Sequence, residues 1–443
     1  MAQDYTANRQ TAHLNAAPAE INRRFAALES AFGAAWLNAG AAPLQSLWQR
    51  KDALAVNQLF LLGDAVEGLS VIDHPWVTDH VGKIKSNDLN NRRGSMFELL
   101  GVNLFRRPVQ TIRPTKVAAA GFDAVLSMPD AARIDMSLKS YGTSAHEQFF
   151  NAEASRTETA FMDALSQYGR NGAYLGAIAS SYPSKADWEA LRGALPDLIA
   201  NPPPRGQLQR FGNAWSTAVL GLPPQFGPYS NAHLSYQVFM LAPFHPNESK
   251  NLFDKFEDAC ANARKHAKSG SDVARLVLMR IPETISLVAC DQWTKDFVRD
   301  NSQVPIDGIY LYQLTVADMP NGQTALSHAL AANELQSFKD WRSPVGKPRR
   351  VFSINYPVGI ISMQPTRRQI VGGAMPLQLD DGYVYQRGNL FKMFKFDPNG
   401  VTNLSITNIA SGIVQHAVVE DAGGQQMVLS GYFPPLKEIT LFD

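Results

Sequence analysis

GFDAVLSM at residues 121–128 and RIDMSLKS at residues 133–140 are the two stretches that decide the expected fold. Both alternate between apolar and polar side chains, and the turn-forming sequence PDAA separates them. Alternation with a period of two is typical of half-buried β-strands, and a short polar turn between two such runs is typical of a β-hairpin. The sequence therefore predicts an antiparallel hairpin over residues 121–140.

The hairpin sorts its side chains onto two faces. Folding it about Ala131 sets Asp123 opposite Lys139, Val125 opposite Ser137 and Ser127 opposite Asp135. One face then carries the polar residues Asp123, Asp135, Ser137 and Lys139, and the other carries the apolar residues Phe122, Ala124, Leu126, Ile134, Met136 and Leu138. A polar face of this kind is also what an ordinary hairpin at a protein surface presents to solvent.

The polar face has the residue types of a metal-assisted phosphodiester cleavage site. A carboxylate supplies oxygen ligands for Mg²⁺, and a lysine orients the attacking water or stabilises the leaving charge. The pattern resembles the restriction-endonuclease-like PD-(D/E)xK nuclease superfamily, with Asp123 as the aspartate and Ser137-Leu138-Lys139 in place of (D/E)xK. The resemblance covers residues 90 to 180 and implies a Mg²⁺-dependent endonuclease acting on double-stranded DNA, such as a type II restriction enzyme or a related bacterial defence nuclease.

Ser137 replaces the second carboxylate of that motif, so another acid has to reach the metal. Some restriction enzymes with this SxK variant take the missing acid from the helix that follows. Here Glu153 lies fourteen residues beyond Lys139, at a helical spacing from core residues. Glu147, Glu158 and Asp135 are the competing candidates.

A further glutamate precedes the hairpin. Residues 95–100 are expected to be helical, and the family often places a metal-supporting glutamate on such a helix, which here is Glu98. The resemblance implies that Asp123 and Glu153 hold the metal with support from Glu98. Lys139 then positions the attacking water, and Ser137 hydrogen-bonds a ligand or that water.

The charge of the chain gives no global attraction to a polyanion. The formal net charge is +1, from 41 Lys plus Arg against 40 Asp plus Glu, so any DNA contact must come from local basic patches. Two segments are rich in basic residues, 81–116 and 342–368, and they provide the candidate DNA-binding residues Arg92, Arg93, Arg106, Arg107, Arg349, Arg350, Arg367 and Arg368.

Other classes of protein are disfavoured by what the sequence lacks. Its two cysteines, Cys260 and Cys290, have no CxxC spacing, which disfavours a disulfide framework and a cysteine zinc site. HEQFF at residues 146–150 lacks the second histidine of a zincin, and neither a Walker A sequence nor a GxSxG motif occurs. Without a signal sequence or a long apolar run at the sequence level, we expect a cytoplasmic protein with no membrane partner.

The expected fold class is α/β, with a restriction-endonuclease-like mixed sheet flanked by helices. Helices are expected at 18–37 and 42–66 as an N-terminal appendage to a nuclease core. A Pro-rich break at 201–206 divides the chain into domains 1–205 and 206–443, although the same stretch is equally compatible with a rigid loop inside a single large domain. The second domain is expected to be mixed α+β and to end, from residue 349, in an antiparallel β-rich part. It would serve recognition, oligomerisation or sensing, and symmetric cutting of a duplex requires a homodimer or homotetramer.

A second interpretation belongs to a different class of protein. Because Ser137 removes a charged ligand, the same scaffold is also compatible with a non-catalytic DNA-binding or assembly protein. Binding of a divalent metal that depends on Asp123 distinguishes the two interpretations.

Overall fold

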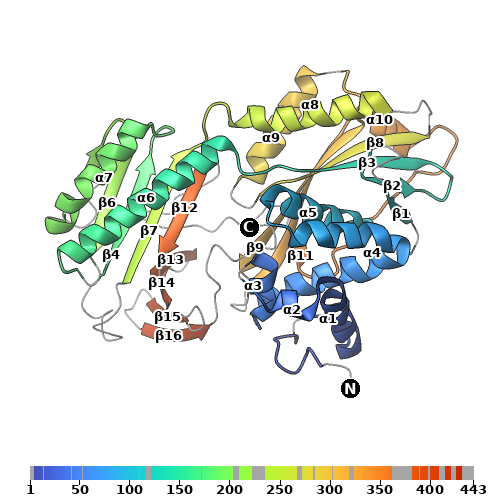
Figure 1. Ribbon diagram of the computed structural model, residues 1–443. Helices are drawn as coiled ribbons and strands as arrows, with labels where there is room; N and C mark the ends of the chain where they lie inside the picture. The colour runs from blue at the N-terminus through green and yellow to red at the C-terminus, as the bar shows by residue number, and fades with distance from the viewer. Residues whose placement is uncertain are drawn as a thin grey trace.

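The structure is a computed structural model of mixed α/β class with several sheets. It describes residues 4–12, 14–40, 42–51, 53–108, 110–115, 121–170, 172–202, 209–221, 235–266, 272–282, 285–301, 303–318, 324–361, 382–388, 390–397, 400–408, 415–420 and 426–431. Figure 1 shows two α/β lobes side by side, with the N-terminal helices beneath the lobe that contains β3.

The first lobe is organised by a seven-stranded sheet in the order β1-β2-β3-β8-β9-β10-β11. The strands are β1 (Thr111–Pro114), β2 (Ala124–Ser127), β3 (Arg133–Ser140), β8 (Val273–Arg280), β9 (Gly308–Asp318), β10 (Thr324–Glu334) and β11 (Ile360–Ile361). The first three strands are antiparallel, β3, β8 and β9 run parallel, and β10 returns antiparallel to β9. The predicted hairpin therefore lies inside the sheet, with β3 paired on both sides.

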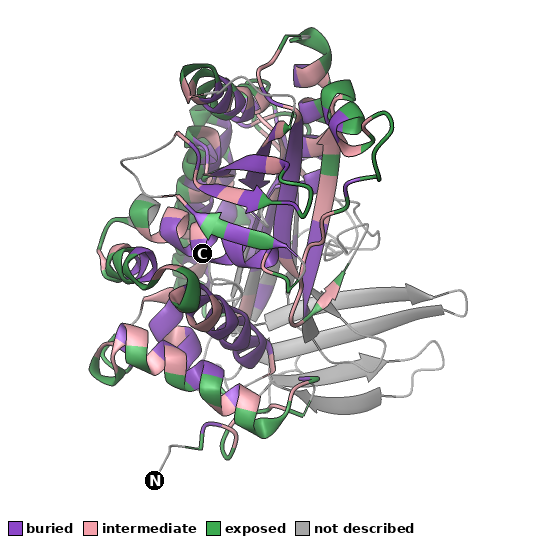
Figure 2. Ribbon diagram, turned by 90° about the vertical axis from the view of Figure 1, so that its right-hand side faces the viewer, coloured by how far each residue is buried: buried purple, intermediate pink, exposed green. Residues whose placement is uncertain are grey.

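Helices cover both faces of this sheet, as Figure 1 shows. On one face, α4 (Ala53–Lys85) and α5 (Leu89–Leu104) bury Leu138, Leu276 and Tyr312 in a common core. On the other face, α8 (Glu248–His266) and α9 (Leu287–Asp300) pack against Val277, Met279 and Leu311. Figure 2 shows buried residues along most of this lobe's central strands. Successive side chains of β8 and β9 point alternately into these two hydrophobic cores, because successive residues of a strand face opposite sides of the sheet.

The N-terminal appendage consists of α1 (Pro18–Phe32), α2 (Ala34–Leu37) and α3 (Pro43–Gln49), which pack with α4. The segments predicted to be helical are mostly helical, but 18–37 is interrupted at Gly33 between α1 and α2, and 42–66 is interrupted after Gln49 between α3 and α4. The segment 73–76 forms a kink within α4. Asp73 has non-helical dihedral angles there and Pro75 follows it, as expected for a proline that interrupts the helical hydrogen bonds.

The second lobe is a five-stranded sheet in the order β12-β7-β4-β6-β5, covered by α6 (Ala145–Gln167) and α7 (Lys185–Ala200). Its strands are β4 (Gly172–Ala179), β5 (Gln209–Phe211), β6 (Trp215–Gly221), β7 (Ser235–Pro243) and β12 (Gly382–Gly388). Strand β4 was predicted as part of the nuclease core, but it pairs with β6 and β7 rather than with β3. A boundary at residue 205 therefore separates strands that pair with each other. It parts β3 from β8 in the first sheet, and β4 from β6 and β7 in the second.

Most of the second lobe, from α6 to β7, lies between β3 and α8 in the sequence, and β12 joins its sheet from the C-terminal part of the chain. The segments that follow β3 and precede α8 meet. The hydroxyl groups of Tyr141 and Ser144 donate to the buried carboxylate of Glu248 over 2.6 and 2.8 Å. Beside them, the rings of His146 and His245 stack with their centroids 3.6 Å apart. The chain thus leaves the first lobe and returns to it at the same place.

The C-terminal part contains a four-stranded antiparallel sheet formed by β13 (Leu390–Asp397), β14 (Gly400–Asn408), β15 (Gln415–Glu420) and β16 (Gln426–Gly431). This confirms the predicted antiparallel β-rich part. Residues 351–356, which lie within the predicted β-rich part, have no regular structure after the short helix α10 (Gln336–Arg342). Phe352, Ile354 and Tyr356 pack instead against the first core, so their alternation reflects burial without strand pairing.

Among the described residues, α4 alone is long and apolar enough to cross a membrane, and 72% of its most apolar window is buried inside the protein. That degree of burial is consistent with the core helix of a soluble protein. Cys260 and Cys290 are both buried as free thiols.

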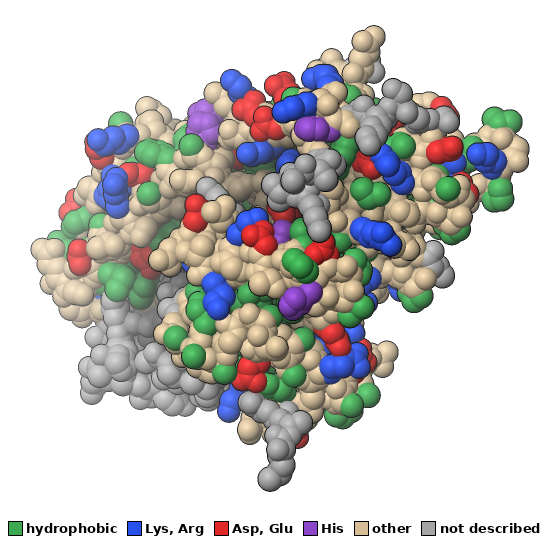
Figure 3. Space-filling view, turned by 45° about the vertical axis from the view of Figure 1, so that its right-hand side comes forward, with side chains coloured by type: hydrophobic (Ala, Val, Ile, Leu, Met, Phe, Trp, Pro, Cys, Tyr) green, Lys and Arg blue, Asp and Glu red, His purple; other side chains and the backbone are tan. Residues whose placement is uncertain are grey.

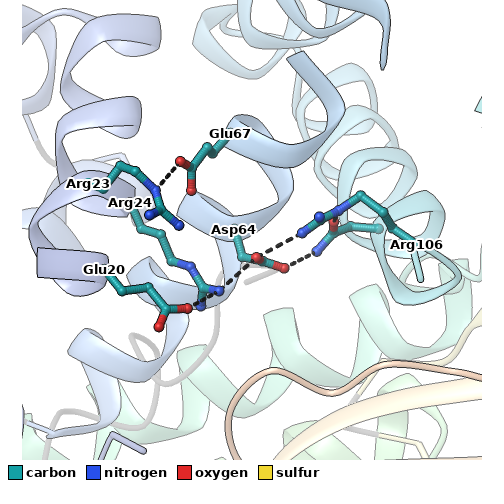
Figure 4. A network of polar contacts seen from close by, with 7 residues as sticks. Glu20, Arg23, Arg24, Asp64, Glu67 and Arg106 are labelled. Atoms are coloured by element: carbon teal, nitrogen blue, oxygen red, sulfur yellow. Dashed lines mark hydrogen bonds and ion pairs between the residues drawn. The ribbon is translucent and has the colours of Figure 1, made fainter. Parts of the chain in front are cut away.

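A buried ion network joins the N-terminal helices to α5 (Figure 4). The carboxylate of Asp64 on α4 lies 3.0 Å from the guanidinium of Arg24 on α1 and 2.8 Å from that of Arg106, which follows α5. The side-chain amide of Asn103 donates to the same carboxylate over 2.7 Å. One buried acid therefore neutralises two arginines from different segments, and a nearby exposed pair joins Arg23 to Glu67.

We expect Asp64→Ala to lower the free energy of unfolding by about 3 kcal/mol, because Arg106 loses its counter-charge and Arg24 keeps only Glu20, 2.6 Å away. The matched control Glu67→Ala removes an acid from the exposed pair and should cost about 1 kcal/mol or less. Urea unfolding of both variants measures the difference. Equal losses in the two would contradict the role assigned to Asp64.

A buried histidine holds β10 against the segment before β11. The Tyr312 hydroxyl lies 2.8 Å from His328 Nδ1, and His328 Nε2 lies 2.7 Å from the Val358 carbonyl oxygen. Burial lowers the pKa of His328 from 6.5 to about 4. The folded protein therefore holds this ring neutral, with Nε2–H donating to the carbonyl and Nδ1 accepting from the tyrosine.

This pKa sets the sign of a pH effect on stability. Since the folded pKa lies below the unfolded value, the contribution of His328 is fully present above pH 6.5 and is lost as the pH falls towards 4, by up to about 3 kcal/mol. Urea unfolding from pH 7.5 to 4.5 should show a weaker pH dependence in His328→Gln than in the unaltered protein, over about that range. Identical pH profiles would exclude this origin.

Candidate functional site

The observed register of the hairpin differs from the predicted one. Val125 pairs with Asp135, and Ser127 pairs with Arg133, so the predicted opposition of Asp123 to Lys139 is wrong by two residues. Ala131 adopts a positive φ of 65° in the turn, and Met128 N–H donates to the Ala132 carbonyl, which closes a tighter turn than the sequence suggested. A shift of two keeps the side chains of the paired strands on their expected faces. Phe122, which precedes β2, is the exception, because it packs with α8 and not in the core that holds Leu126 and Ile134.

Asp123 lies directly before β2 and is anchored on β3. Its backbone N–H donates to the Met136 carbonyl. Its Oδ2 accepts from the backbone N–H of Leu138 over 2.7 Å and from the Ser137 hydroxyl over 3.4 Å. Lys139 Nζ lies 3.9 Å from the same oxygen. Ser137 and Lys139 therefore both lie beside Asp123, and Ser137 is its nearest neighbour on the opposite strand.

Glu98 reaches this group from α5, in a cavity of about 190 Å³ that it lines with Asp123. The Glu98 carboxylate is bound by His80 Nε2 over 2.6 Å, and His80 Nδ1 lies 2.9 Å from the Trp76 carbonyl oxygen. The other lining residues are Trp76, His80, Lys83, Thr115, Gly121, Phe122 and Asn262. Since both ring nitrogens of His80 are engaged, its imidazole fixes the position of Glu98.

The surroundings of Asp123 in the cavity shift the pKa of its carboxyl group. Burial raises the pKa of its carboxyl group, Lys139 opposes that rise, and the negative charge of Glu98 adds to it. Two carboxylates that repel each other in a partly dehydrated cavity gain from a shared cation. The site therefore favours a positive charge between Asp123 and Glu98.

The donor chemistry fits a divalent ion bound through two carboxylates. Among the described residues, hydrogen bonds and ion pairs engage Oδ2 of Asp123 and Oε2 of Glu98, which leaves one oxygen of each available. Mg²⁺ is commonly held by one or two carboxylates with water in its other positions. In the described part of the chain, no group of three or more Asp, Glu, His and Cys side chains has the arrangement of a metal site.

Glu153 does not join this cavity. It is buried on α6 against α7, where Arg156 binds one carboxylate oxygen and Arg192 lies 2.7 Å from the other. Its inward-facing position, expected from helical spacing, is correct, but it faces the core of the second lobe. The structure therefore places Glu98, and not Glu153, beside Asp123.

The alternative acids also lie elsewhere or have other partners. Glu158 accepts hydrogen bonds from Tyr236 and Tyr385 in the second lobe. Asp135 is buried on β3 and ion-paired with Arg133. Glu147 is buried in the first turn of α6 and does not line the cavity.

Several of the predicted DNA-binding arginines serve the fold. Arg350 is buried and bridges Asp130 and Asp272, Arg106 belongs to the Asp64 network, and Arg92 donates to the Ser86 carbonyl. Arg93 donates to Thr143 over 3.4 Å, whereas Arg107 and Arg349 are exposed. Arg367 and Arg368 lie outside the described residues. On the face drawn in Figure 3, basic and acidic side chains are interspersed.

His80 and Asn262 are the cavity residues that the sequence did not single out. Neither is close in sequence to the hairpin, and a lone histidine on a long helix carries no spacing signal. His80 reaches Glu98 across 18 positions, from one helix to the next. Only the packing of α4 against α5 could show this pair.

The comparisons of this chain with protein-family models, with curated proteins and with solved structures found no match.

Proposed function

We propose that this protein is a Mg²⁺-dependent endonuclease that hydrolyses phosphodiester bonds of DNA. The observation that supports this most is that Asp123, directly before β2, shares a cavity with Glu98 of α5 and has Lys139 of β3 3.9 Å from its carboxylate, which is anchored to the backbone of Leu138. Two acids that share a cavity, with a lysine beside one of them, fit metal-assisted hydrolysis of a phosphodiester.

Asp123 and Glu98 would hold the metal, and Ser137 would orient Asp123. When bound, the ion withdraws charge from the scissile phosphate and lowers the pKa of a bound water. Lys139, half-exposed beside Asp123, is placed to orient the attacking water or to stabilise the charge on the phosphate. His80 holds Glu98 in position from behind, as partners of metal-binding carboxylates commonly do.

The order of elements around the site supports a restriction-endonuclease-like core. Helix α5 precedes the antiparallel strands β1, β2 and β3, and α8 then leads into β8, which pairs parallel with β3. The expected helix that follows the hairpin is thus split in two, because the second lobe is inserted before α8. We assign target recognition or oligomerisation to this inserted lobe.

Cleavage of both strands of a duplex requires two such sites, so the proposal includes a homodimer or homotetramer. A restriction or bacterial defence role, in the cytoplasm, is the setting in which an endonuclease of this kind acts. A defined fragment pattern from plasmid DNA would favour a restriction enzyme over a nonspecific defence nuclease.

The rival proposal is a non-catalytic DNA-binding or assembly protein on the same scaffold. Ser137 favours it, because the described residues supply only two carboxylates to the cavity. That scaffold predicts no metal binding that depends on Asp123.

Asp123→Ala and Lys139→Ala should each reduce the Mg²⁺-dependent cleavage of plasmid DNA by at least about 100-fold, because each removes a charge that acts in the transition state. Lys139→Ala should keep its affinity for DNA. The matched control Lys295→Ala removes an exposed lysine paired with Asp291 on α9 and should cut normally. Undiminished cutting by either site variant would refute the site.

A second measurement identifies the acid that assists Asp123. Calorimetric titration with Mn²⁺ should show that Glu98→Gln weakens binding at least about tenfold, because it removes a charged ligand. Glu153→Gln should leave the affinity unchanged while lowering thermal stability, because Arg156 and Arg192 lose their partner. The reverse ranking of the two affinities would restore Glu153 as the second acid.

A further inference from the structure

A groove of about 520 Å³ is lined by residues 71–73 of α4 and by residues 106–108 and 110–114. The cavity that holds Asp123 is lined by later residues of the same two segments, Trp76 and His80 of α4 and Thr115 directly after β1. The groove and the cavity share no lining residue, but their walls come from neighbouring parts of the same two segments.

The walls of the groove are positively charged. They include three arginines, Arg106, Arg107 and Arg113, against the single acid Asp73. Asp73 is engaged, because its side chain accepts from the Trp76 backbone N–H over 3.0 Å at the kink of α4. The groove thus presents guanidinium groups to whatever it binds.

The three arginines differ in how much of each is available. Arg106 is held by Asp64 and Asn103. Arg107 is exposed and uses one nitrogen, over 3.2 Å, on the Ile354 carbonyl. Arg113 is exposed on β1 and forms no ion pair with any described residue. Arg107 and Arg113 are therefore free to bind an anion from solution.

We propose that this groove binds the sugar–phosphate backbone of DNA beside the scissile position, with Arg107 and Arg113 each contacting a phosphate. The proposal rests on the proposed function, because it takes the cavity at Asp123 as the cleavage site. A guanidinium group matches the geometry of phosphate oxygens. β1 is an edge strand of the seven-stranded sheet, so the groove lies at one edge of that sheet.

The rim of the groove has apolar side chains that can contact the sugars of the DNA backbone. Val71 and Ile72 expose 86% and 38% of their surface, and apolar side chains at this position can pack against deoxyribose. Backbone contacts position a nuclease without reading sequence. We therefore propose that this groove positions the DNA backbone relative to the cleavage site, and that other parts of the chain recognise the bases.

The test is the salt dependence of DNA affinity. Fluorescence anisotropy of a labelled duplex, with Ca²⁺ in place of Mg²⁺, gives the slope of log K against log salt for the full chain and for Arg107→Ala/Arg113→Ala. Each phosphate contact contributes about 0.9 to that slope, so the double variant should lose about two.

Arg299→Ala/Lys339→Ala is the matched control. It also removes two exposed positive charges, from α9 and α10 at another groove, and should keep the original slope. An unchanged slope in Arg107→Ala/Arg113→Ala, or an equal loss in the control, overturns the proposal.

The outcomes also separate this groove from the proposed function. If the unaltered protein binds DNA through Arg107 and Arg113 but never cuts it, the groove assignment stands and the nuclease assignment fails. If the protein cuts DNA and the double variant keeps the original slope, the groove assignment fails alone. If the protein does not bind duplex DNA at all, both fail.

Discussion

The hydrogen bond from the Leu138 backbone N–H to the Asp123 carboxylate is the contact on which the site depends. A backbone donor in the middle of a paired strand cannot move independently of the sheet, so it fixes one carboxylate oxygen with the rigidity of the whole lobe. Ser137 and Lys139 flank that donor and approach the same oxygen. Asp123 and Glu98 line the same cavity, and the roles proposed for the site follow from this anchored position of Asp123.

The local part of this arrangement could be predicted from the sequence. Alternation placed Asp123, Ser137 and Lys139 on one face, and helical spacing placed Glu98 and Glu153 on helices. The register could not be predicted, because the left-handed Ala131 permits a turn that composition does not reveal. A register shifted by two leaves the faces unchanged, so an error in pairing did not become an error in the residues of the site.

Contacts between residues far apart in the sequence account for the remaining differences between the predicted and the observed site. Glu153 has the right spacing and an inward face, but α6 belongs to the second lobe, and its buried carboxylate is neutralised by arginines from α6 and α7. His80 supports Glu98 only because α4 packs on α5. Runs of arginine were similarly ambiguous, since a buried guanidinium such as that of Arg350 stabilises the fold through Asp130 and Asp272, and sequence alone does not distinguish it from an exposed one.

The insertion of one lobe within the other has a consequence for how the chain folds as it leaves the ribosome. Strand β3 pairs with β8, and residues such as Ser140 and Arg280 that meet across this pair are 140 positions apart. Because synthesis proceeds from the N-terminus, the hairpin emerges long before its parallel neighbour and must wait with an open edge while the inserted lobe is made. Pairings of high sequence separation form slowly and leave such edges exposed to aggregation. Nascent chains of this protein should therefore depend on chaperones until α8 and β8 have emerged.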